Sequence, residues 1–440
     1  MQRRRTETER GGRLGFGLAL LMLGAAVEGA RAADGRFEIS QSHVPYTISR
    51  PGSYVVTEDL DSPSGDAPVI FIATNYVTLD LNGHRLQQAY DHAIIQSSGG
   101  CSYITVRHGR LLHVNNLARA LELNSLFNRV EDVEICGFNE TGLFSADYTL
   151  LKRCRVVGGE GFNGINSGQG SMVLACEAAG NTAYLHGTGI SGDHGFLVVD
   201  SIVSGWRGTG IGSFIGFWGD TGYLCVNNVV SDNQLDALTV EAFRLGSGGL
   251  VAGCTAQGNQ DALTNAAGIL ARDGVVVADC SIEGRNYPGI TTSNGTIVAR
   301  NALKGPNCDL KTGQGSVVRG NTLHEGGINV QEGCLVAGNS VWRDVYMNPL
   351  LLLAGAGYAL ENNLWGWDTP GIQMVGKNSR ADRNNISTVT DIRVDLGSSN
   401  LIVRNRFNAM TIIASNDFVG ATLVGSEGMS ANLPWANIDW

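Results

Sequence analysis

Short runs of β-branched and other apolar residues, each closed by a glycine-rich turn, follow one another along most of the chain. Examples are Gly274–Ile282 (GVVVADCSI), Gly295–Leu303 (GTIVARNAL) and Gly333–Val341 (GCLVAGNSV), none of which shows a sustained 3.6-residue period. Such runs predict strands, because successive side chains of a strand point to opposite sides. We therefore expect many short strands and no helical repeats.

The clearest repeat lies in Gly315–Asp344, where GSVVRGNTLHEG and GGINVQEG are followed by GCLVAGNSVWRD. We aligned the chain on the small polar residue that follows each Val-rich run. Successive members of this alignment lie 18 to 27 residues apart, a period typical of solenoids. The aligned positions are Cys136, Cys154, Cys176, Ser201, Asn228, Cys254, Cys280, Asn301, Asn321, Asn339, Asn363, Asn384 and Asn405. Parallel strands stacked coil on coil, ~4.8 Å apart, would place these residues in one column.

The residue types in this column suit a buried corner. An Asn side chain can hydrogen-bond to the equivalent Asn or backbone of the next coil, and Cys is a small substitute that tolerates burial. Most of the nine cysteines are therefore expected to be stacked, buried thiols. Disulfides are the alternative, since the coil spacing is compatible with their Cα distances, but parallel Cβ directions make the bond torsion awkward. No metal site is predicted, because the chain has no CxxC pair and no His within four residues of a Cys.

The two ends differ from the repeats. Residues 1–32 combine a basic start (Arg3–Arg5), an apolar stretch (Gly15–Val27) and small residues at Ala30-Arg31-Ala32, which predicts a cleaved signal peptide. A short membrane anchor is the alternative. We expect residues 33–100 to form an N-terminal cap and the first coils, 101–428 the β-helix repeats, and 429–440 a C-terminal cap.

Composition and charge narrow the possible partners. Gly accounts for 60 of 440 residues while 43% are hydrophobic, which indicates tight turns around a core. The formal net charge of −10 gives no long-range attraction for nucleic acid or anionic membranes. No other apolar run reaches the ~20 residues of a membrane-spanning helix. The sequence therefore predicts a secreted or periplasmic protein.

The column of Asn and Cys residues and the segment TISRPGSYVVTEDL…NYVTLDLNGHRL resemble the right-handed parallel β-helix superfamily, which includes pectate lyases and polygalacturonases. The segment is similar to the N-terminal part of exported β-helix repeat proteins, and the resemblance covers residues 45–420. It implies an all-β fold, a single right-handed parallel β-helix of about 13 coils. It also implies a polysaccharide partner.

Candidate chemistry concentrates in the widest coils, between Cys176 and Cys280, where extra residues are expected to leave the regular coil. Aromatic side chains suit stacking on sugars, and carboxylates, His and Arg suit proton transfer and charge neutralisation. We assign catalysis to Asp193, His194 and Glu241. The predicted substrate-binding residues are His186, Trp206, Arg207, Trp218, Asp220, Asp236 and Arg244.

Aligning the Gly-Ile strands places Asp193 and Glu241 in one column two coils apart, roughly 9–10 Å. That separation is near the upper end of the range for inverting glycoside hydrolysis. Asp193-His194, flanked by Gly192 and Gly195, resembles the Gly-His-Gly segment of polygalacturonases, although the other motifs of that family are missing. A lyase or epimerase would instead use a base and a cation from His186, His194, Arg207 and Arg244.

The same candidate residues also have simpler, structural interpretations. Asp and Asn in glycine-rich turns often stabilise the turn itself, and a loop Trp can pack on the coil. Asp91-His92, after the first Asn-Gly turn, is a second candidate site, and Trp365 with Trp367 forms a possible second aromatic patch.

Three functions follow. The first is a polysaccharide lyase or glycoside hydrolase acting in a groove on coils 176–280. The alternative is a non-catalytic carbohydrate-binding or cell-surface scaffold, which the lack of a complete catalytic motif favours. An accessory role in metal or cofactor handling is disfavoured, because Met-rich or His-rich clusters are missing, and no cofactor is predicted.

Overall fold

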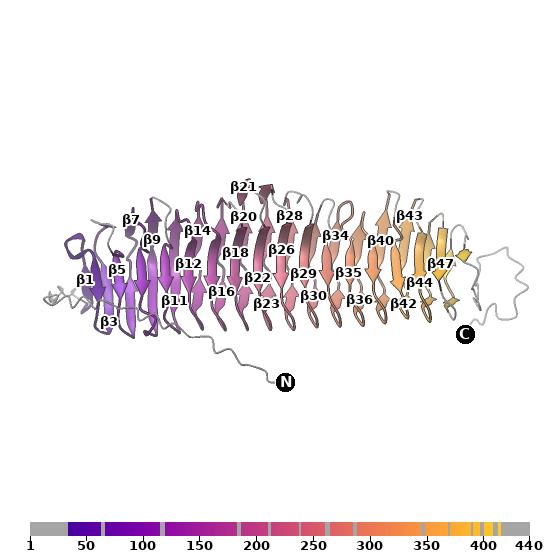
Figure 1. Ribbon diagram of the computed structural model, residues 1–440, viewed down its shortest axis with the longest axis horizontal. Helices are drawn as coiled ribbons and strands as arrows, with labels where there is room; N and C mark the ends of the chain where they lie inside the picture. The colour runs from indigo at the N-terminus through magenta and orange to yellow at the C-terminus, as the bar shows by residue number, and fades with distance from the viewer. Residues whose placement is uncertain are drawn as a thin grey trace, which may run out of the picture.

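Each sequence repeat forms one coil of a parallel β-helix with three strand positions (Figure 1). The computed structural model describes residues 34–62, 67–114, 119–182, 186–209, 213–236, 239–259, 265–284, 288–344, 348–367, 370–388, 390–396, 400–407 and 412–414. Two strand positions belong to sheet A and the third to sheet B. The coils follow one another along one axis, from β1 at the indigo end to β50 at the yellow end.

The first strand of each coil pairs in parallel with the first strands of neighbouring coils, within sheet A. These strands are β1 (Phe37–Ile39), β3 (Gly52–Val56), β6 (Val77–Asp80), β9 (Ile104–His113), β11 (Arg129–Cys136), β13 (Leu150–Lys152), β16 (Met172–Leu174), β19 (Leu197–Val199), β23 (Leu224–Val226), β27 (Leu250–Ala252), β30 (Val276–Ala278), β33 (Ile297–Ala299), β36 (Val317–Arg319), β39 (Leu335–Ala337), β42 (Tyr358–Leu360), β45 (Arg380–Asp382) and β48 (Leu401–Val403).

The second strand of each coil forms the other half of sheet A, and the long strands β9 and β11 occupy both positions in their coils. The remaining second strands are β4 (Leu60–Asp61), β7 (Arg85–Gln88), β14 (Arg155–Val157), β17 (Glu177–Ala179), β20 (Ile202–Ser204), β24 (Val229–Ser231), β28 (Thr255–Gln257), β31 (Ser281–Glu283), β34 (Ala302–Lys304), β37 (Thr322–His324), β40 (Ser340–Arg343), β43 (Asn363–Gly366), β46 (Asn385–Ser387) and β49 (Arg406–Phe407).

The third strand position makes sheet B. Its strands are β2 (Tyr46–Ile48), β5 (Ile70–Ile72), β8 (Ile95–Ser97), β10 (Leu121–Leu123), β12 (Thr141–Ser145), β15 (Asn163–Ser167), β18 (His186–Gly192), β22 (Ser213–Gly219), β26 (Thr239–Leu245), β29 (Asn265–Ala271), β32 (Ile290–Thr292), β35 (Leu310–Thr312), β38 (Ile328–Val330), β41 (Leu351–Ala354), β44 (Pro370–Val375), β47 (Thr390–Leu396) and β50 (Ile412–Ala414). A 3-10 turn, η1 (Gln41–His43), and a small pair, β21 (Arg207–Thr209) with β25 (Gln234–Asp236), lie outside the two sheets. The all-β parallel fold and its number of coils, about 13 after the N-terminal segment, are confirmed.

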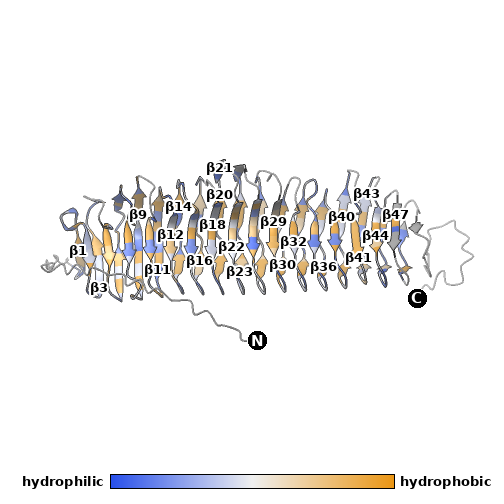
Figure 2. Ribbon diagram, in the orientation of Figure 1, coloured by the Kyte–Doolittle hydropathy of each residue, from blue (hydrophilic) through white to orange (hydrophobic). Residues whose placement is uncertain are grey.

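The core is built from columns of inward side chains. Ile165, Ile190 and Phe217 pair in register on sheet B, and each is less than 2% exposed. Figure 2 shows the same alternation as apolar and hydrophilic bands along the strands. Burying each such side chain contributes about 1.5–3 kcal/mol, so the stack of columns supplies the main driving force for folding.

A sharp corner joins the two strands of sheet A in each coil. One residue with positive φ, such as Arg300 (φ 56°), is followed by an inward polar residue, such as Asn301. The Nδ2 of Asn301 donates to the Oδ1 of Asn321 (3.0 Å) and to the carbonyl of Val277 (3.0 Å). The same pattern repeats at Asn321, Asn339, Asn362 and Asn384, which confirms the predicted Asn ladder.

Two assignments in the sequence alignment are wrong. The positive φ of Asp132 and the pairing of Cys136 with Val157 put Val133, and not Cys136, at the ladder position. The pairing of Ser340 with Asn363 likewise makes Asn362 the ladder residue. Asn363 lies on the exposed side of its strand. In both cases the turn residue with positive φ sets the corner, and the sequence pattern does not reveal it.

The cysteines are free thiols, as predicted. The thiol of Cys176 accepts from the backbone N–H of Cys154 (3.4 Å), so the two occupy consecutive ladder positions. Burial raises the pKa of Cys308 to about 12, which keeps that thiol protonated and unreactive at neutral pH.

The widened coils differ from expectation. Their extra residues do not all leave the coil, because many of them lengthen sheet B. Strands of three residues, such as β10 and β32, give way to seven residues in β18, β22, β26 and β29. The outer face of sheet B is therefore broad in these coils.

The expected signal peptide (1–32) and C-terminal cap (429–440) lie outside the described residues. In the part of the chain that the structure describes, no helix is long and apolar enough to cross a membrane.

Candidate functional site

A continuous row of side chains runs along the outer face of sheet B, and we call it the sheet-B strip. Its members pair in register from coil to coil, at steps of ~4.8 Å. They are Gln96, Glu122, Phe144, Asn166, Ser191, Trp218 and Arg244. The strip combines two aromatic rings with amides, a hydroxyl and both signs of charge over roughly 29 Å.

Strand alternation places these side chains on the outer side of sheet B, but Ser191 is only 4% exposed and its Oγ donates to the carbonyl of Ile165 (3.3 Å). Trp218 lies between Phe217 and Gly219, which are both buried, so its indole points away from the core. Beside it, Arg244 donates through Nη2 to the Oε1 of Glu241 (2.7 Å) and through Nε to Oε2. Glu241 is 4% exposed, so Arg244 covers a carboxylate that is otherwise enclosed by the sheet.

His194 and Asp220 meet at the turn that follows sheet B. The Nδ1 of His194 lies 2.8 Å from the Oδ2 of Asp220 and 2.8 Å from the Oγ1 of Thr221. The imidazole side chain is 57% exposed, so solvent reaches this pair. A carboxylate that orients an imidazole in this way leaves Nε2 as the ring atom for proton transfer.

The predicted column of Asp193 and Glu241 is wrong. Ile190 pairs with Phe217, and Phe217 pairs with Phe243, which matches Asp193 to Asp220. Glu241 lies two positions before Phe243, whereas Asp193 lies three positions after Ile190. The two carboxylates are therefore offset by five strand positions, roughly 16 Å, beyond the range used for glycoside hydrolysis. The lengthened strands β22 and β26 shifted the register that the Gly-Ile motif suggested.

The other predicted site residues are dispersed. Trp206 is completely buried and its Nε1 donates to the carbonyl of Ala178 (3.1 Å), so it cannot stack on a sugar. His186 is exposed at the start of β18, where its Nδ1 contacts the Oγ of Ser213 (3.1 Å). Arg207 is exposed on β21, which pairs with β25, the strand of Asp236. The side chain of Asp236 lies outside the described part of the structure.

The N-terminal end of the strip opens into a polar hollow of about 350 Å³, which we call the acidic pocket. Its lining brings together three carboxylates, an imidazole and a guanidinium. The lining residues are Asp91, His92, Ala93, Gln96, Arg119, Glu122 and Glu140. The second candidate in the sequence, Asp91-His92, thus borders a cavity.

Arg119 organises the acidic pocket. Its Nη1 donates to the Oε1 of Glu122 (3.0 Å), and its Nη2 donates to the Oε1 of Glu140 (2.6 Å). The guanidinium also lies 4.4 Å from the ring centre of Phe144, in a cation–π contact. Arg119 therefore bridges the two glutamates and holds their carboxylates close together.

Sequence reasoning missed Glu122 and Glu140. Gln96 donates to the Oε2 of Glu122 (2.9 Å), so both oxygens of Glu122 are engaged, while the Glu140 side chain is half exposed. One signal was available, since Arg119 and Glu140 lie 21 residues apart, which is one coil period. The strand pairing was needed to recognise it.

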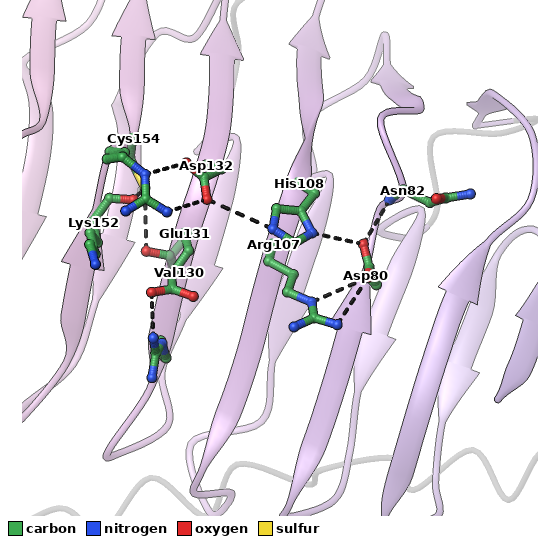
Figure 3. A network of polar contacts seen from close by, with 11 residues as sticks. Asp80, Asn82, Arg107, His108, Val130, Glu131, Asp132, Lys152 and Cys154 are labelled. Atoms are coloured by element: carbon green, nitrogen blue, oxygen red, sulfur yellow. Dashed lines mark hydrogen bonds and ion pairs between the residues drawn. The ribbon is translucent and has the colours of Figure 1, made fainter. Parts of the chain in front are cut away.

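A second polar network follows the corner of sheet A (Figure 3). Asp80 accepts from Arg107 (3.2 Å), from the N–H of Asn82 (3.0 Å) and from His108 (3.3 Å). Burial opposes ionisation of Asp80, but these donors outweigh it and lower its pKa. Arg153, one coil on, lowers the pKa of Asp132 by donating to both carboxylate oxygens. Because both carboxylates are occupied by neighbouring donors and neither lines the acidic pocket, we assign the network to corner stability.

No group of three or more His, Cys, Asp or Glu side chains that could hold a metal ion occurs among the described residues.

No family model matches the chain. No curated protein matches it either. Solved structures do. One is the catalytic domain of a GH87 alpha-1,3-glucanase in complex with nigerose, at 10% identity over 88% of this chain and 64% of that chain, with a TM-score of 0.24. This chain thus spans less than two thirds of that domain.

Two further structures are similar over most of their length. PfbA, a surface adhesin of Streptococcus pneumoniae, is 9% identical over 86% of this chain and 87% of its own, with a TM-score of 0.30. The A-module of the Azotobacter vinelandii mannuronan C-5 epimerase AlgE4 is 9% identical over 90% and 97%, with a TM-score of 0.21. On its own strand pairing the chain has the parallel β-helix fold, as its resemblance to that superfamily implied.

Proposed function

We propose that this protein binds an extended polysaccharide along the sheet-B strip. The observation that carries the proposal is the strip itself, a row of aromatic, amide, hydroxyl and charged side chains repeating once per coil. A linear chain of sugars presents alternating apolar faces and hydroxyl edges over a comparable length. Phe144 and Trp218 supply stacking surfaces, and Asn166 between them supplies hydrogen bonds.

Within this function, the acidic pocket favours glycoside hydrolysis. Hydrolysis needs one carboxyl group to protonate the glycosidic oxygen and a second carboxylate to activate water or attack the anomeric carbon. Glu140, the more exposed of the pair, is the candidate proton donor once the sugar chain displaces its ion pair with Arg119, and Glu122 is the candidate second carboxylate. The glycosidic C–O bond breaks, and the two products together gain the elements of water.

Lyase chemistry on the widened coils is the second candidate, and the contact between His194 and Asp220 favours it. The imidazole Nε2 would remove the C5 proton next to a uronate carboxylate, and the C4–O bond would break as a C4=C5 double bond forms. The departing sugar oxygen takes up a proton, and no water is consumed. This reaction gives an unsaturated uronate, so its product differs from that of hydrolysis.

A panel of neutral and uronate polysaccharides tests the proposal. Binding is measured by retardation in affinity gels, and products by new reducing ends and by unsaturated-uronate absorbance. We expect Trp218→Ala to weaken binding about tenfold, because it removes one stacking surface worth ~1.5 kcal/mol. We expect Glu140→Gln to reduce the formation of reducing ends at least about 100-fold while binding persists, because it removes a proton donor.

Each other outcome has a defined meaning. Loss of activity in His194→Gln but not in Glu140→Gln would move the chemistry to the widened coils. Binding that depends on Trp218 without any product would favour the non-catalytic scaffold. If no polysaccharide binds, or if Trp218→Ala binds like the unaltered protein, the sheet-B strip is not the binding surface.

A further inference from the structure

A second groove lies on the outer face of sheet A, in coils that contribute nothing to the sheet-B strip described above. Strands β37, β40, β43 and β46 form its floor, and its volume is about 250 Å³. Its inward neighbours Leu323, Val341 and Leu364 are buried in the core. We call this feature the sheet-A groove.

One wall of the sheet-A groove is aromatic. His324, Trp342 and Trp365 occupy one register column on consecutive coils. The rings of Trp342 and Trp365 are stacked with centroids 5.4 Å apart, and His324 lies 4.0 Å from Trp342. Trp365 is 37% exposed, so this wall keeps a large indole in contact with water.

The other wall is polar and uncharged. Its side chains lie two positions earlier on the same strands, in register from coil to coil. They are Thr322, Ser340, Asn363 and Asn385, all exposed. Asn385 donates to Asn363 (3.4 Å), so the amides line up along the groove. Among the residues that line the groove, His324 is the only one with an ionisable side chain.

Trp367 extends the aromatic surface beside the groove. It is 63% exposed, and its ring stands nearly perpendicular (88°) to that of Trp365, with centroids 6.4 Å apart. Exposed indoles are unfavourable in water, and a cluster of them marks a binding surface. Two rings at a right angle form a corner that can receive the C–H face of a sugar.

We propose that the sheet-A groove binds a neutral glycan. An uncharged sugar ring has an apolar C–H face for the indoles and hydroxyl groups for the hydroxyl and amide wall, so it satisfies both sides of the groove. Apart from His324, the lining residues offer a charged ligand no ion-pair partner. The groove differs in this respect from the sheet-B strip, where Arg119, Glu122 and Arg244 carry charge.

The proposal does not depend on the function assigned to the sheet-B strip, and its test uses binding alone. Soluble neutral glycans (β-glucan, dextran, mannan and xyloglucan) are cast into native gels, and the retardation of the protein is measured. We expect at least one glycan to retard the unaltered protein, and Trp365→Ala to weaken that binding about tenfold. Asn363→Ala, on the opposite wall, should weaken the same interaction several-fold.

Tyr358→Ala provides a matched control, since Tyr358 is 47% exposed on the first strand of the same coil and does not line the groove. Its retardation should equal that of the unaltered protein. Trp365→Phe keeps an aromatic ring and should retain most of the binding, which separates loss of stacking from misfolding. Thermal unfolding of each variant checks the fold independently.

Three results would overturn the proposal. The first is that none of the neutral glycans retards the protein. The second is that Trp365→Ala and Asn363→Ala bind like the unaltered protein, even where Trp218→Ala has lost binding, which would confine recognition to the sheet-B strip. The third is a concentration-dependent dimer that Trp365→Ala converts to monomer, which would make the groove an interface between two copies.

Discussion

At the scale of single residues, the corner of sheet A explains why Asn recurs. An Asn at the ladder position accepts through Oδ1 from one neighbouring coil and donates through Nδ2 to the other, so a stack satisfies each buried amide. Ser201 replaces it by accepting from the N–H of Cys176 (3.1 Å) while its own N–H donates to Asn228 (2.9 Å). Cys fits because a thiol can be buried at little cost.

Adjacent asparagines in β43 and its preceding corner test this account. We expect Asn362→Ala to lower the free energy of unfolding by about 1–3 kcal/mol, because the N–H of Asn339 and the carbonyl of Val336 lose their buried partner. Asn363→Ala, one residue on and exposed, should change it by less than about 0.5 kcal/mol. Denaturant unfolding measures both.

Equal effects of the two substitutions, or a larger effect at Asn363, would contradict the register described here. The comparison therefore checks both the energy of the ladder and the choice of ladder residue.

At the scale of elements, the turn after sheet B carries an aromatic stack. Tyr76, Tyr103, Phe127 and Tyr148 stand on consecutive coils with ring centroids 5.1–5.2 Å apart, all with positive φ. In the next coils the same turn position is glycine, beginning with Gly170 (φ 64°). Positive φ is unfavourable for a side chain with Cβ, so stacking must offset that cost in the first coils.

This balance predicts an unusual order of variants at Tyr103. Tyr103→Ala removes two stacking contacts and keeps the unfavourable φ of 61°, so it should be the more destabilising substitution. Tyr103→Gly removes the same contacts but relieves the backbone, and should be more stable than the alanine variant by about 1 kcal/mol. Chemical denaturation of the two variants measures the difference.

A glycine variant that is less stable than the alanine variant would mean that chain entropy outweighs backbone strain at this turn.

At the scale of the whole molecule, the β-helix behaves as a one-dimensional stack, since each coil touches only its neighbours. Different functions can therefore occupy different faces and different coils. The sheet-B strip runs from β8 to β26, and the sheet-A groove from β37 to β46, so the two proposed sites share no strand.

Ion pairs along the corner of sheet A make the stability of the stack depend on pH. Arg300 lowers the pKa of Asp279 by donating to it from the next coil. Asp382 is pulled in two directions, because burial raises its pKa while Arg404 and Arg380 lower it, with a net lowering. A carboxyl whose folded pKa is lowered adds stability above its unfolded pKa of ~3.9, and that stability is lost as pH falls through the folded pKa.

Two isosteric substitutions compare how much a buried and an exposed ion pair contribute to stability. Asp382 is 2% exposed, so Asp382→Asn should lower the free energy of unfolding at pH 7 by about 1–3 kcal/mol. The loss should shrink when the pH is brought to the acid limit of folding. Asp279→Asn removes a similar bidentate contact at the surface, where the side chain is 51% exposed, and should have no measurable effect. Thermal unfolding from pH 7 to pH 3 compares them.

A pH-independent loss in Asp382→Asn would indicate a packing defect instead of a lost ion pair.

Much of the fold could be predicted, whereas the site could be predicted only in part. The β-branched runs, the glycine turns and the Asn and Cys column predicted a parallel solenoid with free thiols. Trp218 and Arg244, both predicted to bind substrate, are register partners on neighbouring coils, and Asp91-His92 borders the acidic pocket. Trp206 was wrongly predicted to bind substrate, because the sequence of a Gly-rich segment does not show whether its indole packs inward or outward. Glu122 and Glu140 carried no local motif.

The sequence by itself determined the repeating unit, because strand alternation and turn chemistry are local and act within one coil. Only the tertiary structure decided which residues of different coils share a column. A change in strand length, as in β22 and β26, or in the position of one residue with positive φ, as at Glu361, shifts the alignment of its own coil by one or more positions. The sites on both sheets are built from such columns, so their composition depends on register, which is set by contacts between coils.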